Sequence, residues 1–248
     1  MNHPLQTIIL ALALALTACQ EKTAEPAATP PNIQPTQPGI NVDALLPQRP
    51  NKKNVGDLNH CPDKKTCEIA CPENAILHKS DTDYTCKKDD DFHGPRVIFR
   101  EDGSQLAYQE WKNGKTNGEW ILFYASGEMS ARSKNINGQS TGESTSWFKN
   151  GRVKHHCPIA VNGKMTCTQY YEDGTKEHER PVLNGEHHGT WVRWRQDGTK
   201  ASETELRHSK FHGKKTSYYA NGQIRQTAYY IQDKKQGLVT NFHPNGQK

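Results

Sequence analysis

A repeat with a period of 24 residues occupies the last 155 residues of the chain, and it constrains the fold more than any other feature. Seven segments each run from an opening residue to a glycine nine positions later, and successive openings lie 24, 24, 23, 24, 24 and 24 residues apart. The openings are Gly94, Gly118, Gly142, Met165, Gly189, Gly213 and Gly237. A period of this length indicates one supersecondary unit per repeat, whose apolar face is buried only when neighbouring units stack.

Two positions within the unit predict a strand. Five residues after every opening stands an aromatic residue, and two residues before each aromatic stands a β-branched residue. Residues two apart on a strand point to the same face, and both residue classes favour strands. We therefore expect the aromatics to form one continuous stripe that is the core of the array: Phe99, Phe123, Trp147, Tyr170, Trp194, Tyr218 and Phe242.

The closing glycine of each unit predicts a hairpin turn. It follows Asn or Asp in six of the seven units, and these dipeptides supply the positive φ angles of a two-residue hairpin turn. A second turn comes later in each unit, at Asn113-Gly114, Asn137-Gly138, Asn162-Gly163 and Asn184-Gly185, and in degenerate form at Ser209 and Asp233. Each unit is thus two strands and two turns. Between the turns lies a second apolar position, filled by Trp111, Ile136, Ile159, Val182, Leu206 and Tyr230.

The predicted fold of residues 94–248 is all-β, an elongated and twisted antiparallel sheet of tandem β-hairpins with about thirteen or fourteen strands. The pattern of an aromatic, two residues, Asn or Asp with Gly, and then Asn-Gly-x-x-Gly resembles the MORN repeat, in the bacterial variant found in an antitoxin-like family. The resemblance implies an array that docks onto proteins or membranes. The fourth unit departs from the pattern, because Met165 replaces the opening glycine and Cys157 and Cys167 enter. This irregularity indicates a bend locked by a disulfide.

Residues 56–93 are predicted to be a small disulfide-rich segment. Besides Cys19 the chain has six cysteines, an even number, and four of them crowd a stretch with little apolar sequence. We expect a disulfide between Cys157 and Cys167, because these residues flank the Asn162-Gly163 turn. The other four then pair among themselves in one of three ways that the sequence leaves open, the four being Cys61, Cys67, Cys71 and Cys86.

The cysteines of this segment raise two alternatives to disulfides, an iron–sulfur cluster and a zinc ion. The run from Cys67 to Ile76 resembles the end of a bacterial ferredoxin motif, but the further upstream cysteines that a cluster needs are missing. A zinc ion held by His60 and the cysteines would lack a paired C-x2-C ligand set. We therefore expect no metal and no cofactor.

Residues 1–18 have the features of a lipoprotein signal peptide. The apolar run Ile8 to Leu16 is too short to span a bilayer. The following Leu16-Thr17-Ala18-Cys19 resembles a lipobox, although no Lys or Arg precedes the run. The resemblance implies a diacylated Cys19, and Gln20 in place of Asp implies an outer-membrane anchor facing the periplasm. Residues 19–55 hold seven of the fourteen prolines and are expected to be a disordered tether.

The sequence contains no recognisable catalytic motif, so it predicts a protein that is not an enzyme. The histidines outside the signal peptide, including His155-His156 and His187-His188, are interpreted as solvated turn residues rather than metal ligands. A net charge of only +5 with interspersed signs gives no basic stripe for nucleic acid.

The predicted function is therefore binding. The chain is expected to be a lipid-anchored, periplasm-facing repeat protein whose partners are the membrane, through Cys19, and another protein. The antitoxin-like resemblance suggests an immunity protein that neutralises a secreted toxin effector, such as a lipase or a cell-wall hydrolase. The alternative is a structural or lipid-contacting scaffold of the envelope.

Overall fold

The computed structural model describes residues 46–50, 61 and 63–248. They belong to one compact unit, Asn41–Lys248. A second unit, Met1–Ile40, lies outside the described residues, and so do Cys19, the predicted signal peptide and most of the predicted tether. Within the described part of the chain, no helix has the length and apolarity that a membrane span requires.

The regular structure of the described residues consists of strands, which alternate with short turns as the repeat predicts. The strands are β1 (Ile76–Lys79), β2 (Asp83–Lys88), β3 (Asp91–Phe99), β4 (Gln105–Lys112), β5 (Lys115–Phe123), β6 (Met129–Ile136), β7 (Gln139–Trp147), β8 (Val153–Cys157), β9 (Lys164–Tyr170), β10 (Lys176–Leu183), β11 (Glu186–His187), β12 (Gly189–Trp194), β13 (Lys200–Arg207), β14 (Lys210–Tyr218), β15 (Ile224–Ile231) and β16 (Lys234–Asn241).

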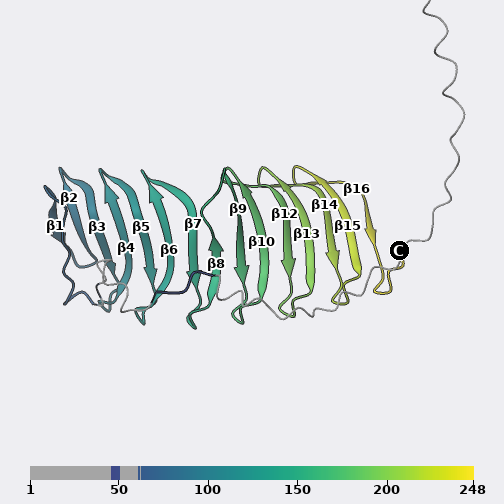
Figure 1. Ribbon diagram of the computed structural model, residues 1–248, viewed down its shortest axis with the longest axis horizontal. Helices are drawn as coiled ribbons and strands as arrows, with labels where there is room; N and C mark the ends of the chain where they lie inside the picture. The colour runs from purple at the N-terminus through teal and green to yellow at the C-terminus, as the bar shows by residue number, and fades with distance from the viewer. Residues whose placement is uncertain (1–45, 51–60, 62) are drawn as a thin grey trace, which may run out of the picture. The chain divides into compact units, whose positions relative to one another are not determined.

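All sixteen strands form one antiparallel sheet, and they follow one another in chain order from β1 to β16, with β11 paired only to β10 (Figure 1). The prediction of an all-β sheet of tandem hairpins is confirmed. The sheet begins earlier than expected, however, because β1 pairs with β2 and β2 pairs with β3. The Cys-rich segment thus supplies two strands of the sheet, and residue 94 lies within β3 instead of marking the start of the array.

The closing turns differ from the predicted two-residue turn. Gly103 N donates to Arg100 O at 2.9 Å and Arg100 N donates to Ser104 O at 2.8 Å, so three residues form the loop. Gly103 has a φ of 82°, whereas Asp102 keeps a negative φ. This is a type I turn followed by a left-handed glycine, the G1-bulge hairpin. Asp102 is selected because its Oδ1 accepts the N–H of Ser104 at 2.8 Å.

The second turns have the predicted conformation. Asn113 and Gly114 have φ angles of 50° and 71°, the type I′ geometry that matches strand twist. The same geometry persists without glycine at Ser209 and Asp233, with φ angles of 61° and 67°. There the side chains of Ser209 and Asp233 accept the backbone N–H groups of His187 on β11 and Phe211 on β14, at 3.0 and 2.8 Å. These hydrogen bonds offset the cost of a left-handed non-glycine residue.

The aromatic stripe is buried only in the first half of the array. We call the face that carries Val97 and Phe99 the core face. Phe99, Phe123, Trp147 and Tyr170 are buried in one cluster with the disulfide cysteines Cys61, Cys67 and Cys86 and with Ile69. In contrast, Trp194, Tyr218 and Phe242 are only half-buried. The expected continuous core is therefore wrong for the last three units, because the covering Cys-rich segment lies over the first units and no described segment covers the others.

A side-chain hydrogen bond joins most successive units. The residue after each stripe aromatic donates to the carbonyl oxygen of the next aromatic, which lies 23 positions later. The donors in five of the six joints are Arg100, Tyr124, Tyr171, Arg195 and Tyr219. The remaining joint, between the third and fourth units, has Phe148 at this position, and the Phe148 side chain has no hydrogen-bond donor.

Residues 46–50, which we call the strap, lie at this interrupted joint. Arg49 Nη1 donates to Phe148 O at 3.3 Å, and Trp147 Nε1 donates to Pro47 O at 3.2 Å. Leu46 packs against the buried cluster. The strap thus binds the third unit about 100 residues away in sequence, through hydrogen bonds to Trp147, Phe148 and Lys149.

At two of the openings, Gly118 and Gly213, close packing across the core face requires glycine. A Cβ on Gly118 would collide with the carboxylate of Glu110, and a Cβ on Gly213 would collide with that of Glu205. Glu110 Oε2 accepts the N–H of Glu119 at 2.8 Å, so the carboxylate lies against the backbone beside the glycine. Glycine is present because a side chain would occupy the same space.

The second apolar position is partly misassigned. The register pairs Gly118 with Asn135, as Gly94 pairs with Trp111, so Asn135 and not Ile136 occupies this position in the second unit. Ile136 is 54% exposed, and Ile159 is 65% exposed because β8 ends before it. Val182 and Leu206 are buried as a shared apolar position requires.

Candidate binding face

The structure pairs all six cysteines other than Cys19. Cys157 and Cys167 form a disulfide across the β8–β9 hairpin, the pair expected from the sequence. Of the three open connectivities for the other four, the structure has Cys61 with Cys67 and Cys71 with Cys86. The first pair closes a small loop, and the second fixes that loop to β2. These disulfides hold the segment that covers the core face.

The face opposite the stripe carries the candidate site, and we call it the open face. Residues paired directly across antiparallel strands share a face. Arg180 pairs with Cys167, and His178 pairs with both Gln169 and Arg193. Alternation along β12 then places Trp191 beside Arg193 on this face. The open face of β8–β15 therefore combines imidazole, guanidinium and aromatic side chains.

Arg180 lies at the centre of this group. Its Nη1 is 3.3 Å from His187 Nε2 and its Nη2 is 3.4 Å from His178 Nε2. A guanidinium only donates, so both imidazoles accept through Nε2 and are neutral. Three further donors are buried without a hydrogen-bond partner among the described residues: Arg180 Nε, His187 Nδ1 and Trp191 Nε1. We call these three residues, together with His178, the Arg180 cluster.

An aromatic row continues from the cluster toward the C-terminus. The Arg180 guanidinium lies 4.7 Å from the Trp191 ring centroid, a cation–π contact. Trp191 stacks on Phe211 with centroids 6.5 Å apart, and Phe211 meets Tyr230 edge to face at 5.8 Å. All three rings are half-buried, so they present apolar surface to solvent. We call Trp191, Phe211 and Tyr230 the aromatic row.

Burial favours the neutral form of the histidines in this region by lowering their pKa values. Desolvation is the largest cause of a lowered pKa at His155, His156, His178 and His187. The positive charge of Arg180 lowers the pKa of His178 and His187 further. These residues lie on β8, β10 and β11 and are half-buried, so the interpretation of His155-His156 and His187 as solvated turn residues is wrong. The neutral imidazoles leave Arg180 as the fixed positive charge of the cluster.

A group of metal-ligand types also occurs on the open face. His155, Cys157 and Cys167 have ligand atoms within 4.8 Å of one another, and His155 Nε2 is 3.5 Å from Cys157 Sγ. Both sulfurs are bonded to each other, so neither is the thiolate that zinc prefers. In this oxidised form the group offers one ordinary ligand, the His155 imidazole.

The arrangement contains a hydroxyl and an imidazole in contact on the core face. Thr145 Oγ1 lies 3.0 Å from His156 Nδ1. The two residues are direct cross-strand partners in β7 and β8, which accounts for the contact. Thr145 is only 8% exposed, so a substrate does not reach its hydroxyl. The pair is consistent with a packing role.

No motif in the sequence points directly to the Arg180 cluster. Trp191 occupies the repeat position that elsewhere holds Arg96, Trp120, Ser144, Cys167, Lys215 and Val239, so the position is variable on the outward face. Arg180 likewise replaces the small or neutral residues of other units. A search for strand positions that vary between units, and not for conserved ones, would have found this face.

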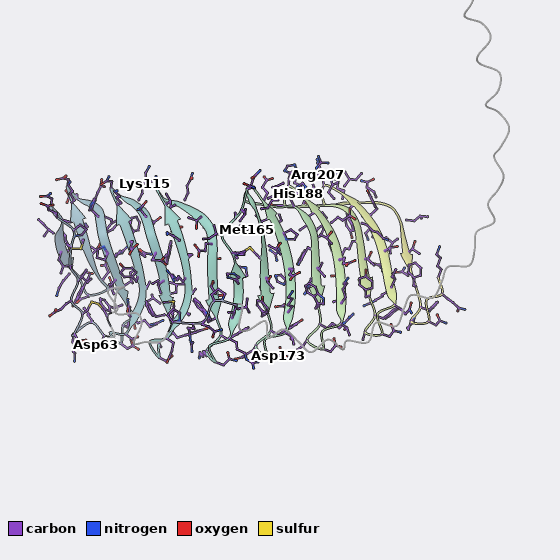
Figure 2. All side chains as sticks on the ribbon, in the orientation of Figure 1. Asp63, Lys115, Met165, Asp173, His188 and Arg207 are labelled. Atoms are coloured by element: carbon purple, nitrogen blue, oxygen red, sulfur yellow. A yellow bond between two sulfur atoms is a disulfide. The ribbon has the colours of Figure 1, made fainter. Side chains whose placement is uncertain are left out.

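The two edges of the sheet also differ. Figure 2 shows Lys115, His188 and Arg207 along the edge of the type I′ turns and Asp173 along the edge of the closing turns. Asp102, Asp173 and Asp197 have lowered pKa values because they accept hydrogen bonds from the hydroxyl and the backbone of the residue two positions later. The acidic side chains of the closing turns are therefore engaged in the turn itself.

The chain was compared with known proteins. No curated protein matches it. Among solved structures, one described as the crystal structure of TarM is similar over 66% of this chain and 21% of that chain, with 10% identity and a TM-score of 0.25. The chain spans about a fifth of that protein, and the likeness carries no argument about function. A family model described as MORN repeat variant matches residues 211–232, which is the hairpin of β14 and β15 in the sixth unit.

Proposed function

We propose that this protein is a noncatalytic binding scaffold, in which the stacked MORN-like hairpins hold the open face as a rigid surface for a protein partner. One observation carries the proposal. The open face of β10–β15 gathers Trp, Arg, Phe and Tyr side chains that are half-exposed, and these residue types dominate the energetics of protein interfaces. The match of residues 211–232 to a MORN repeat variant supports the extension of this repeat to the other six units.

The absence of catalysis is part of the proposal. The exposed hydroxyls that contact carboxylates lie in turns, as Ser104 does against Asp102, and the open face offers aromatic rings and a guanidinium, which bind better than they react. Strands joined by disulfides and by interrepeat hydrogen bonds also give a preorganised surface, which lowers the entropic cost of association.

The proposed location is the outer membrane, with the array facing the periplasm. Support comes from the lipobox-like Leu16-Thr17-Ala18-Cys19 and from three disulfides, which persist in oxidising compartments. Cys19→Ser should release the protein from sedimented membranes into the soluble fraction. Membrane retention equal to that of the unchanged protein would refute the lipid anchor.

The proposed partner is a toxin effector, with the protein acting as its immunity protein. This finer proposal is supported by the resemblance to bacterial antitoxin-like MORN repeats. The test expresses the chain in cells that receive periplasm-targeted lipases or wall hydrolases encoded near its own gene. Survival with the chain, death without it, and a stoichiometric complex with the purified effector would support the proposal. Retention of lipid alone, with no protection, would favour an envelope scaffold.

A further inference from the structure

The Arg180 cluster contains a charge that the described part of the chain leaves without a counterion. Two strand arginines are paired with carboxylates: Arg96 Nε lies 2.8 Å from Asp83 and Arg132 Nε lies 2.6 Å from Glu119. The strand arginines without such an ion pair among the described residues are otherwise exposed to solvent, namely Arg193, Arg207 and Arg225, whereas Arg180 is half-buried. Among the described residues Arg180 forms no such ion pair, and its nearest polar partners are two neutral imidazoles. Desolvating a guanidinium without a carboxylate is costly, so this position is unfavourable for stability alone.

The charged side chains around the Arg180 cluster are mainly positive. Arg193 is exposed next to the cluster and lies 5.8 Å from the Trp191 ring, and Lys215 lies 5.4 Å from the Phe211 ring. The nearby Glu177 carboxylate is engaged by Gln169 Nε2 at 2.7 Å. The aromatic row is therefore bordered by cations whose charges face solvent, and this combination is complementary to a carboxylate flanked by apolar side chains.

We propose that Arg180 is the carboxylate-binding centre of the protein interface, and that it takes an Asp or Glu side chain from an acidic, apolar-flanked segment of the partner. The carboxylate accepts hydrogen bonds from the Arg180 guanidinium and from Trp191 Nε1. Arg180 Nε and Trp191 Nε1 are buried with no hydrogen-bond partner among the described residues, whereas Arg180 Nη1 and Nη2 each donate one N–H to an imidazole. The apolar neighbours of that carboxylate lie over Phe211 and Tyr230. The proposal rests on the proposed function, since it specifies which chemistry the binding face recognises.

Carboxylate binding by Arg180 also gives a role to the two histidines that contact it. His178 and His187 contact the two terminal nitrogens of Arg180 and hold the guanidinium 4.7 Å from the centroid of the Trp191 ring. Because both accept through Nε2, they position Arg180 without neutralising its charge. They are positioning residues, and the charge remains available to the partner.

The first experiment measures binding of a fluorescein-labelled peptide of alternating Glu and Leu to the full mature chain by fluorescence anisotropy. Arg180→Gln should weaken binding by roughly tenfold or more, since it removes a charged hydrogen-bond partner. Trp191→Phe keeps the ring and removes Nε1, and it should weaken binding by roughly threefold. The matched control is Arg207→Gln, an exposed arginine on the neighbouring β13 that should change affinity by less than about twofold.

The outcomes separate the possibilities. Equal losses in Arg180→Gln and Arg207→Gln would overturn the proposal, because general charge would then account for binding. Binding of vesicles that contain anionic lipid, with none of the Glu-Leu peptide, would also overturn it. Far-UV circular dichroism of each variant must match the unchanged protein, and Trp191→Phe gives an independent reading should Arg180→Gln unfold.

The proposed function has its own readout. A protein partner that binds Arg180→Gln as tightly as the unchanged chain would overturn the Arg180 site and leave the scaffold standing. Protection against an effector that is lost only in Arg180→Gln would support both. A chain that captures no protein partner would instead overturn the scaffold.

Discussion

The joint between the third and fourth units should be the point at which the array separates into two parts. The ladder between β8 and β9 contains only two residue pairs, His155 with Gln169 and His156 with Thr168, whereas β9 and β10 share seven. The joint also lacks the interrepeat hydrogen bond, since Phe148 has no donor. The Cys157–Cys167 disulfide crosses this joint and closes it covalently.

We expect the double change Cys157→Ala with Cys167→Ala to destabilise residues 164–248 more than residues 61–157. The two cysteines are 10 positions apart, and closing a loop of that size removes roughly 2.5–3 kcal/mol of chain entropy from the unfolded state at 25 °C. With a urea dependence of about 2 kcal/mol per molar for a unit of this size, the midpoint should fall by on the order of 1 M.

The assay is a urea titration read by hydrogen exchange and mass spectrometry, which follows each half through its own peptides. The unchanged protein should lose protection in both halves over one transition, and the double variant over two. A matched control is Cys71→Ala with Cys86→Ala, whose effect should appear in the first half. A single transition with an unchanged midpoint in the Cys157 and Cys167 variant would refute the reasoning.

Three further predictions concern stability. Tyr219→Phe should cost about 0.5–1.5 kcal/mol, because it removes only the 2.8 Å hydrogen bond to Phe242 O, and a change nearer 0 in thermal unfolding would contradict the interrepeat role. Asp90→Gly should raise stability by roughly 0.5 kcal/mol, since Asp90 has a φ of 67° in a type I′ turn, and an unchanged or lower Tm would contradict it. Because His178 and His187 have folded pKa values lowered from 6.5, unfolded chains bind more protons there, so stability should be complete above pH 6.5 and fall as pH decreases below it. The double variant His178→Gln with His187→Gln should flatten that urea-midpoint profile.

The sequence determined the repeat unit in advance. A 24-residue period with a fixed aromatic, a β-branched residue two positions earlier and a glycine at each closing turn admits few structures besides a stack of hairpins, because strand alternation and turn chemistry are local properties. The Cys157–Cys167 pair followed for the same reason, since a short hairpin brings its two flanking positions together.

Local reasoning failed where the outcome depends on neighbours. The dipeptide Asp102-Gly103 fits both a two-residue type I′ turn and a three-residue G1-bulge loop. The strand register selects the G1-bulge loop. Ile136 was misplaced by one residue because only pairing with Gly118 fixes the register. The repeat pattern predicts equal burial for all seven stripe aromatics. Their burial differs in the structure because the Cys-rich segment covers only the first units.

The candidate site belongs wholly to the tertiary structure. Arg180, His187 and Trp191 come from three strands, and no spacing in the sequence relates them, because contacts across a sheet depend on register and strand order. The lipobox-like segment at Cys19 and the period of the hairpins are local patterns, so both can be identified from the sequence alone. The contact between the Arg180 guanidinium and the Trp191 ring forms only when the strands align. The alignment also determines that the neighbours of Arg180 are imidazoles and a tryptophan instead of a carboxylate.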